Sequence, residues 1–168
     1  GGLIARHDAT LDRTTTGKGR VADWMLDSIR TLKLKNGCGI RTKHAVPTLE
    51  EALLAAKGRV LVNLDKADRY FDLVVPVLER TGTTRQIVMK GSKTAKEVLA
   101  LYGKYLDEMI YMPVVNLDSE NAAEMMQAYI SDLKPAAYEL PYAQAAATAI
   151  PLRPPDPPPR RAANRALR

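Results

Sequence analysis

The sequence between residues 48 and 142 alternates between helix-like and strand-like segments, and this alternation limits the fold more than any other feature. Thr48 and Thr94 each precede a glutamate by three residues, the pattern of an N-terminal capping box. Apolar residues then recur at helical spacing, and short apolar runs separate the helices. The predicted helices cover residues 48–57, 68–80, 93–106 and 119–133, and the predicted strands cover residues 59–65, 86–90, 109–115 and 136–142. Such an order predicts βαβ units around a parallel sheet, with strands such as 59–65 covered on both faces.

The start of the chain adds a short apolar run, residues 3–5, which predicts one more strand ending at His7 and Asp8. The polar segment 7–19 follows, with four threonines, Arg13 and two glycines. Glycine lets the backbone approach a ligand, and arginine and threonine suit phosphate oxygens. Ordinary Asx and Ser/Thr turns use the same residue types, so the composition alone leaves both interpretations open.

The segment after this loop predicts little regular structure. We expect a short helical turn at residues 26–32 and a loop at residues 35–46. His44 is expected at the surface of that loop. Cys38 is the only cysteine, so no internal disulfide can form.

Two architectures fit this alternation, a doubly wound sheet and part of a (β/α)8 barrel. No Gly-x-Gly-x-x-Gly motif follows a strand, which argues against dinucleotide binding. The chain has 168 residues, whereas a complete barrel needs about 250. A barrel would therefore be partial, with about five parallel strands.

The composition changes after residue 142. Residues 143–149 are almost all alanine, and six of the eleven prolines lie between residues 151 and 159. Five arginines and one aspartate give residues 151–168 a charge of +4, out of +6 for the whole chain. We expect a disordered tail at 143–168, either a frameshifted or truncated reading frame or a basic linker. Because no aromatic residues accompany these arginines, we do not expect a nucleic-acid partner.

The predicted strands end in polar residues. Carboxyl ends of parallel strands meet at one edge of a sheet or barrel, although a polar residue is also the ordinary exit of a strand into solvent. Together these residues offer carboxylates for a hard cation, lysines for phosphate and a histidine for proton transfer. They are His7, Asp8, Asn63, Asp65, Lys66, Lys90, Asn116, Asp118 and Glu139.

The string from His7 to Gly19 closely resembles the second signature of the glycerophosphodiester phosphodiesterase family. Three further pieces agree in order: Val21-Ala22-Asp23-Trp24, Val46-Pro47-Thr48-Leu49-Glu50-Glu51-Ala52-Leu53 and Leu61-Val62-Asn63-Leu64-Asp65-Lys66. The resemblance runs from about residue 3 to residue 142. Since the family consists of metal-dependent TIM-barrel phosphodiesterases, it implies a partial barrel domain at 1–142 followed by the tail.

The resemblance also implies roles for individual residues. His7 takes the place of one of two acid–base histidines, with Asp8 orienting it or shaping the rim around it. The family's Glu-x-Lys strand is replaced here by Asn63-Leu64-Asp65-Lys66, so Asp65 is the expected ligand of Mg²⁺ or Ca²⁺, one residue out of register. The expected phosphate contacts are Lys66, Arg13 and Lys90, with Asn63 and Glu139 on the same rim.

The family's His-Arg motif and Glu-x-Asp metal pair, expected before residue 3, are missing from this sequence, as is the last part of the barrel. We therefore predict a glycerophosphodiester hydrolase that is impaired in this chain and lacks most metal ligands. The alternatives are a non-catalytic phosphate-binding remnant and a binder of anionic polymers that acts through the tail. No apolar run approaches the roughly 18 residues of a membrane span. No secretory signal is visible either, and periplasmic, extracellular and cytoplasmic locations all stay open.

Overall fold

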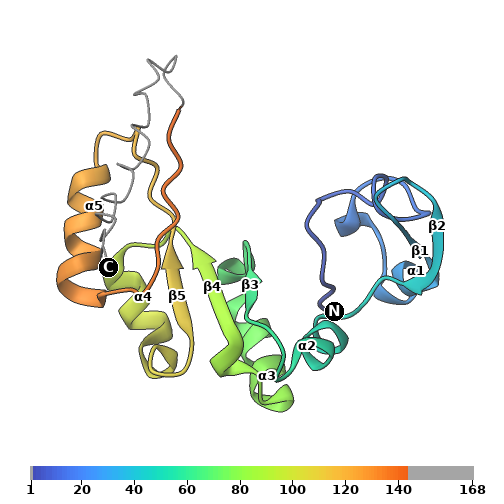
Figure 1. Ribbon diagram of the computed structural model, residues 1–168, viewed down its shortest axis with the longest axis horizontal. Helices are drawn as coiled ribbons and strands as arrows, with labels where there is room; N and C mark the ends of the chain where they lie inside the picture. The colour runs from blue at the N-terminus through green and yellow to red at the C-terminus, as the bar shows by residue number, and fades with distance from the viewer. Residues whose placement is uncertain (1, 144–168) are drawn as a thin grey trace, which may run out of the picture.

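The structure, a computed structural model, describes residues 2–143 (Figure 1). Three parallel strands form its sheet in the order β3-β4-β5. The elements of this part are α2 (Leu49–Ala56), β3 (Val62–Leu64), α3 (Phe71–Thr81), β4 (Ile87–Gly91), α4 (Ala95–Tyr102), β5 (Ile110–Pro113) and α5 (Ala122–Ala128). Short 3-10 turns at Ala67–Tyr70, Thr84–Gln86 and Gly103–Tyr105 and a π turn at Tyr129–Leu133 complete it. The βαβ alternation predicted from the sequence is confirmed, whereas nearly all of the expected tail lies outside the described residues.

The sheet keeps a regular register up to the carboxyl ends of its strands. Asn63 pairs with Val88, and Lys90 pairs with Met112. The predicted strand at 136–142 is reduced to one parallel bridge, between Val114 and Glu139. This bridge places Glu139 beside the end of β5, and therefore near Lys90 at the end of β4.

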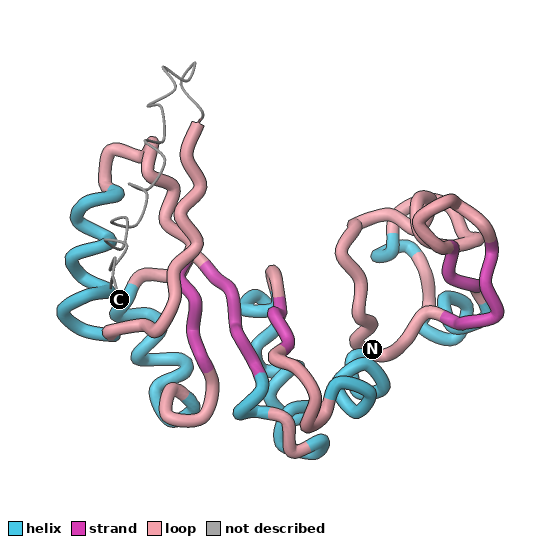
Figure 2. The backbone as a smooth tube through the Cα atoms, in the orientation of Figure 1, coloured by secondary structure: helices cyan, strands magenta, loops and turns pink. Residues whose placement is uncertain are grey.

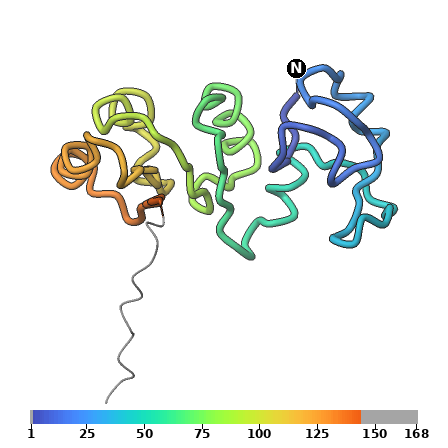
Figure 3. Tube along the Cα trace, turned by 90° about the horizontal axis from the view of Figure 1, so that it is seen from above, coloured from blue at the N-terminus to red at the C-terminus, as the bar shows by residue number. Residues whose placement is uncertain are grey.

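Helix packing follows the predicted patterns. Both capping boxes form, at Thr48 with Glu51 and at Thr94 with Glu97. The largest group of buried apolar residues joins α2, α3 and α4 to the sheet; it includes Leu53, Val74, Leu78, Ile87, Met89, Val98, Tyr102 and Tyr111. In the view from above, the described chain runs from the N-terminal part to α5 as an open arc that does not close on itself (Figure 3).

The open arc leaves β3 at the edge of its sheet. Val60 and Leu61, just before β3, are 59% and 63% exposed. The expectation that this strand is covered on both faces is wrong at these positions, because within residues 2–143 only β4 pairs with β3. The predicted strand at residues 3–5 does not pair with the free edge of β3. Ile4 forms an antiparallel bridge with Thr48 instead.

Residues 7–46 form an N-terminal lobe with its own small core of Leu11, Ile29 and Val46. The expected helical turn is α1 (Leu26–Thr31). The expected loop at 35–46 is wrong, because β1 (Lys33–Lys35) and β2 (Arg41–Ala45) pair there as an antiparallel hairpin (Figure 2). Asn36 organises its turn: the Oδ1 atom accepts hydrogen bonds from the backbone N–H groups of Cys38 and Ile40 at 3.1 and 2.9 Å.

Candidate functional site

The polar segment 7–19 is a closed loop held by its own side chains. The Thr15 hydroxyl donates to the Leu11 carbonyl at 2.6 Å and accepts from the Gly17 N–H at 3.0 Å. A Cβ at Gly17 would lie 2.5 Å from a methyl carbon of Leu32, so the loop backbone passes close to the Leu32 side chain at this glycine. The sequence predicted a ligand loop or an ordinary turn, and these bonds give the loop a fixed shape without settling that choice.

His7, Asp8 and Arg13 form one cluster, called here the histidine cluster. Arg13 makes two hydrogen bonds of 2.7 Å to the two carboxylate oxygens of Asp8. His7 Nδ1 lies 2.9 Å from Asp8 Oδ1. Hydrogen bonds from Arg13, and then from His7, hold the pKa of Asp8 well below its usual range.

This arrangement determines which nitrogen of His7 is available. An ionised carboxylate only accepts hydrogen bonds, so the Nδ1 atom of His7 must carry a proton and donate it to Asp8. In the neutral ring, Nε2 then keeps its lone pair. Because the His7 side chain is 78% exposed, Nε2 is free to take a proton from a bound molecule or water.

A second group, called here the lysine cluster, lies at the carboxyl ends of the parallel strands. It consists of Asp65, Lys66, Lys90 and Glu139. The Nζ atom of Lys90 lies 2.7 Å from a Glu139 oxygen and 3.2 Å from Asp65 Oδ1. The hydrogen bond to Glu139, and then the bond to Asp65, raise the pKa of Lys90.

Lys66 is the outer member of this group. Its Nζ atom lies 4.0 Å from Asp65 Oδ2, and its side chain is 65% exposed. Its backbone has a φ of 61°, in the left-handed region that non-glycine residues rarely adopt. This conformation ends β3 sharply and leads directly into the 3-10 turn at Ala67–Tyr70.

A buried polar group under the end of β4 was not predicted from the sequence. A Cβ at Gly91 would lie 2.5 Å from the Tyr111 hydroxyl and 2.6 Å from an Asp68 carboxylate oxygen. Among the residues that the structure describes, the buried Tyr111 hydroxyl has no hydrogen-bond partner, and burial raises its pKa. A glycine directly after Lys90 was the available signal, because glycine at a strand end often marks a close approach.

The structure thus groups most predicted site residues into two separate clusters. Asp65, Lys66, Lys90 and Glu139 come together as expected, and Asn63 is exposed on β3 two residues before Asp65. Three more of the predicted residues, His7, Asp8 and Arg13, gather on the N-terminal lobe. In the described part of the chain, no hydrogen bond or ion pair joins the histidine cluster to the lysine cluster.

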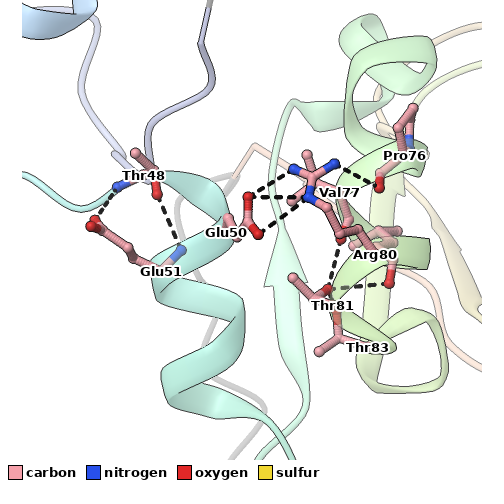
Figure 4. A network of polar contacts seen from close by, with 9 residues as sticks. Thr48, Glu50, Glu51, Pro76, Val77, Arg80, Thr81 and Thr83 are labelled. Atoms are coloured by element: carbon pink, nitrogen blue, oxygen red, sulfur yellow. Dashed lines mark hydrogen bonds and ion pairs between the residues drawn. The ribbon is translucent and has the colours of Figure 1, made fainter.

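The lobe and the sheet are linked through the amino end of α2, where Glu50 faces Arg80 of α3 (Figure 4). Arg30 of α1 donates to Glu51 of α2 at 2.5 Å and to the Val46 carbonyl at 2.9 Å. On the other side of α2, Arg80 of α3 pairs with Glu50 at 2.8 Å. These ion pairs connect the lobe to α2, and α2 to α3.

The residues present do not form a complete divalent-metal centre. No group of three or more His, Cys, Asp or Glu side chains among residues 2–143 is arranged to hold a metal ion. The two carboxylates of the lysine cluster, those of Asp65 and Glu139, are both paired with the ammonium of Lys90. None of the helices in this part of the protein has the length and apolar character needed to cross a bilayer.

Parallel βαβ units with cations and carboxylates at the strand ends define an α/β protein with a polar rim at the carboxyl edge of its sheet. The family model of the glycerophosphoryl diester phosphodiesterase family matches residues 1–114. The chain belongs to this family.

Two solved structures are similar to this chain, and the first supports the fold. A glycerophosphoryl diester phosphodiesterase from Parabacteroides distasonis aligns with a TM-score of 0.62 and 24% identity, covering 78% of this chain and 44% of its own. A glycerophosphodiester phosphodiesterase from Agrobacterium tumefaciens aligns with a TM-score of 0.45 and 18% identity, covering 84% of this chain and 78% of its own. No curated protein matches the sequence. The chain is therefore part of a TIM-type barrel and spans less than half the length of the Parabacteroides protein.

Proposed function

We propose that this chain is part of a phosphodiesterase that cleaves a glycerophosphodiester into glycerol 3-phosphate and an alcohol. The histidine cluster is the observation that carries the proposal. His7 presents Nε2 to solvent while Nδ1 is tied to a carboxylate that Arg13 keeps ionised. A histidine held in this way can take a proton from the attacking nucleophile or give one to the departing alkoxide.

The lysine cluster supplies the phosphate-binding part of the proposal. Lys90 lies on β4 and Lys66 follows the adjacent strand β3, and both approach Asp65. Ammonium groups at such an edge attract the non-bridging oxygens of a phosphodiester, and Arg13 adds a third cation on the lobe. Glu139 and Asp65 hold Lys90, and Asn63 and Asp8 complete the polar surroundings of the two clusters.

Divalent-metal dependence belongs to the proposal for the complete barrel. A bound Mg²⁺ or Ca²⁺ would neutralise charge on the phosphate oxygens. Asp65 is the proposed ligand in this chain, but its pairing with Lys90 and the lack of neighbouring ligands among residues 2–143 do not make a metal centre. We therefore propose that the chain alone is strongly impaired.

A second candidate is a phosphate-binding remnant without catalysis. The incomplete set of metal ligands supports this candidate as well. Asp65 and Glu139 form ion pairs with Lys66 and Lys90, which balances the charges of the two lysines. Such a remnant would bind inorganic phosphate or a glycerophosphodiester without turning it over.

The test measures release of glycerol 3-phosphate from glycerophosphocholine, with and without a chelator. The 168-residue chain should be nearly inactive, whereas a fusion with the missing segments of the Parabacteroides protein should show chelator-sensitive turnover. In the fusion, His7→Ala should lower the rate by about 10² to 10⁴, the usual value of an acid–base group. His44→Ala, on exposed β2, is the matched control and should leave the rate unchanged.

Three results would contradict the proposal. Full activity of the 168-residue chain would mean that the catalytic groups have been misplaced. A fusion that turns over equally well with His7→Ala would remove His7 from the reaction, and a fusion that binds phosphate without turnover would favour the remnant.

A further inference from the structure

The charges of the protein are divided between its two parts. The N-terminal lobe, residues 7–46, contains eight lysines and arginines against four aspartates, a net charge of +4. Residues 47–143 contain eleven lysines and arginines against fourteen acids, a net charge of −3. Of these two parts, the lobe is therefore the one that an anionic surface attracts.

The cations of the lobe are concentrated on the β1–β2 hairpin. Lys33, Lys35, Arg41 and Lys43 lie in its two strands, and no acidic residue occurs from residue 28 to residue 49. Lys35 is the direct cross-strand partner of Arg41. Like charges in this position destabilise a hairpin, and an anionic partner would relieve the repulsion.

The tip of the hairpin carries one exposed aliphatic side chain. Ile40 is 64% exposed and directly precedes Arg41, and both Arg41 and the nearby Lys43 are exposed as well. The side chain of Asn36 fixes the turn through the N–H groups of Cys38 and Ile40. The turn therefore presents Ile40 in a defined shape beside the exposed cations that follow it.

We propose that this hairpin docks on the surface of an anionic phospholipid bilayer. The lysines and arginines would approach the headgroup phosphates while Ile40 enters the boundary with the acyl chains. A nucleic acid fits less well, because residues 33–45 contain no Phe, Tyr or Trp on which bases could stack. An exposed isoleucine gains free energy from a lipid surface but not from a polyanion.

Docking would also bring the histidine cluster near the membrane. Lys35 donates from Nζ to the backbone carbonyl of Asp12 at 3.1 Å. Asp12 directly precedes Arg13, which holds Asp8. The hairpin thus adjoins the loop that carries His7, although the docking surface stands whether or not His7 is catalytic.

The first experiment places a reporter at the tip. Cys38 is the only cysteine and is exposed, so an environment-sensitive fluorophore can be attached there in the full chain. Its emission should shift to the blue with vesicles that contain phosphatidylglycerol, and not with pure phosphatidylcholine vesicles. The same dye on Ala100→Cys in a Cys38→Ser background, on the exposed face of α4, should show no shift.

The second experiment measures affinity by co-sedimentation with the anionic vesicles. Each cation near such a surface contributes about a fivefold gain in binding, so Arg41→Gln with Lys43→Gln should weaken binding about 25-fold. Arg69→Gln with Lys96→Gln removes the same charge from exposed positions outside the lobe and is the matched control. All these variants keep residues 144–168, so the arginines there contribute equally to each.

Ile40→Ser separates a lipid surface from other anions. It should weaken vesicle binding about tenfold, from the lost burial of an aliphatic side chain, and should leave binding to a DNA oligonucleotide unchanged. Equal losses in the two double variants, no vesicle binding at all, or a Cys38 signal that responds to the oligonucleotide but not to vesicles would each overturn the proposal. The last result would identify the hairpin as a polyanion-binding surface instead.

Discussion

Gly91 should not tolerate even one added methyl group. It ends β4 directly after Lys90 and is buried. A Cβ built there lies 2.5 Å from the Tyr111 hydroxyl oxygen and 2.6 Å from an Asp68 oxygen, whereas ordinary contacts begin at 3.4 Å. In Gly91→Ala, the neighbours must therefore move by about 0.8 to 0.9 Å, which is an overpacking change.

The cost follows from how little these neighbours can move. Tyr111 is 3% exposed and its ring stacks on Tyr102, with centroids 5.6 Å apart. Asp68 is 9% exposed, and its backbone carbonyl accepts a hydrogen bond from the Tyr102 hydroxyl. Overpacking of such a site typically costs about 1 to 3 kcal/mol in the free energy of unfolding. For a chain of this length, a loss of about 2 kcal/mol lowers Tm by about 4 to 8 °C.

The assay is urea and thermal unfolding followed by circular dichroism. Gly103→Ala is the matched control, because no atom lies within 4 Å of its built Cβ and its φ is −46°. This control should be neutral or stabilise the protein by about 0.4 to 1 kcal/mol, since alanine restricts the unfolded chain.

Tyr111→Phe tests the mechanism of the effect. The Tyr111 hydroxyl is buried without a hydrogen-bond partner in residues 2–143, so its removal alone should cost little or be slightly stabilising. Combined with Gly91→Ala, it should restore about 1 kcal/mol, because one of the two short contacts is gone. An unchanged Tm in Gly91→Ala, or no recovery in the double variant, would refute the packing argument.

Three further predictions concern single polar contacts. Thr48→Ala should cost about 1 kcal/mol of stability, because it removes the capping bond to the α2 backbone; an unchanged urea midpoint would contradict this. Since Arg13 lowers the pKa of Asp8, their pairing should persist from pH 7 down to about pH 4 and be lost only as the pH falls through that lowered value. Arg13→Gln should raise the Asp8 pKa in a carboxyl NMR titration. Glu139→Gln should lower the pKa of Lys90, whose contribution to stability is present at neutral pH and is lost as the pH rises through its raised value.

The elements that could be predicted are those fixed by contacts between residues close together in the sequence. Thr48 and Thr94 begin helices because each bonds to a backbone N–H three residues later. The hairpin could not be predicted in this way, because β2 (Arg41–Ala45) is polar and lacks apolar alternation. It forms because Asn36 closes the turn and β1 supplies the partner, and neither contact is visible in the strand itself.

The same distinction applies to the candidate site. The lysine cluster followed from one topological rule, that parallel strands end at the same edge, and this rule placed Lys90, Asp65 and Glu139 together. The bond between Arg13 and Asp8 could not be derived, because it depends on how the loop closes over five residues. The contact of Gly91 with Tyr111 was missed for a similar reason, since it depends on the register of two strands and on the position of one buried ring.

The amino end of α2 determines how the two clusters can act together under the proposed function. Three chain segments meet there: Ile4 bridges to Thr48, Arg30 of α1 bonds to Glu51, and Arg80 of α3 pairs with Glu50. The first two contacts attach the lobe that carries the histidine cluster, one directly and one through the segment just before it. The third attaches α3, which packs against the sheet that carries the lysine cluster. Because no hydrogen bond or ion pair in the described residues links the clusters directly, their separation depends on these contacts. Substitutions around α2 should therefore impair a reaction that needs both clusters, while leaving phosphate binding by Lys66 and Lys90 intact.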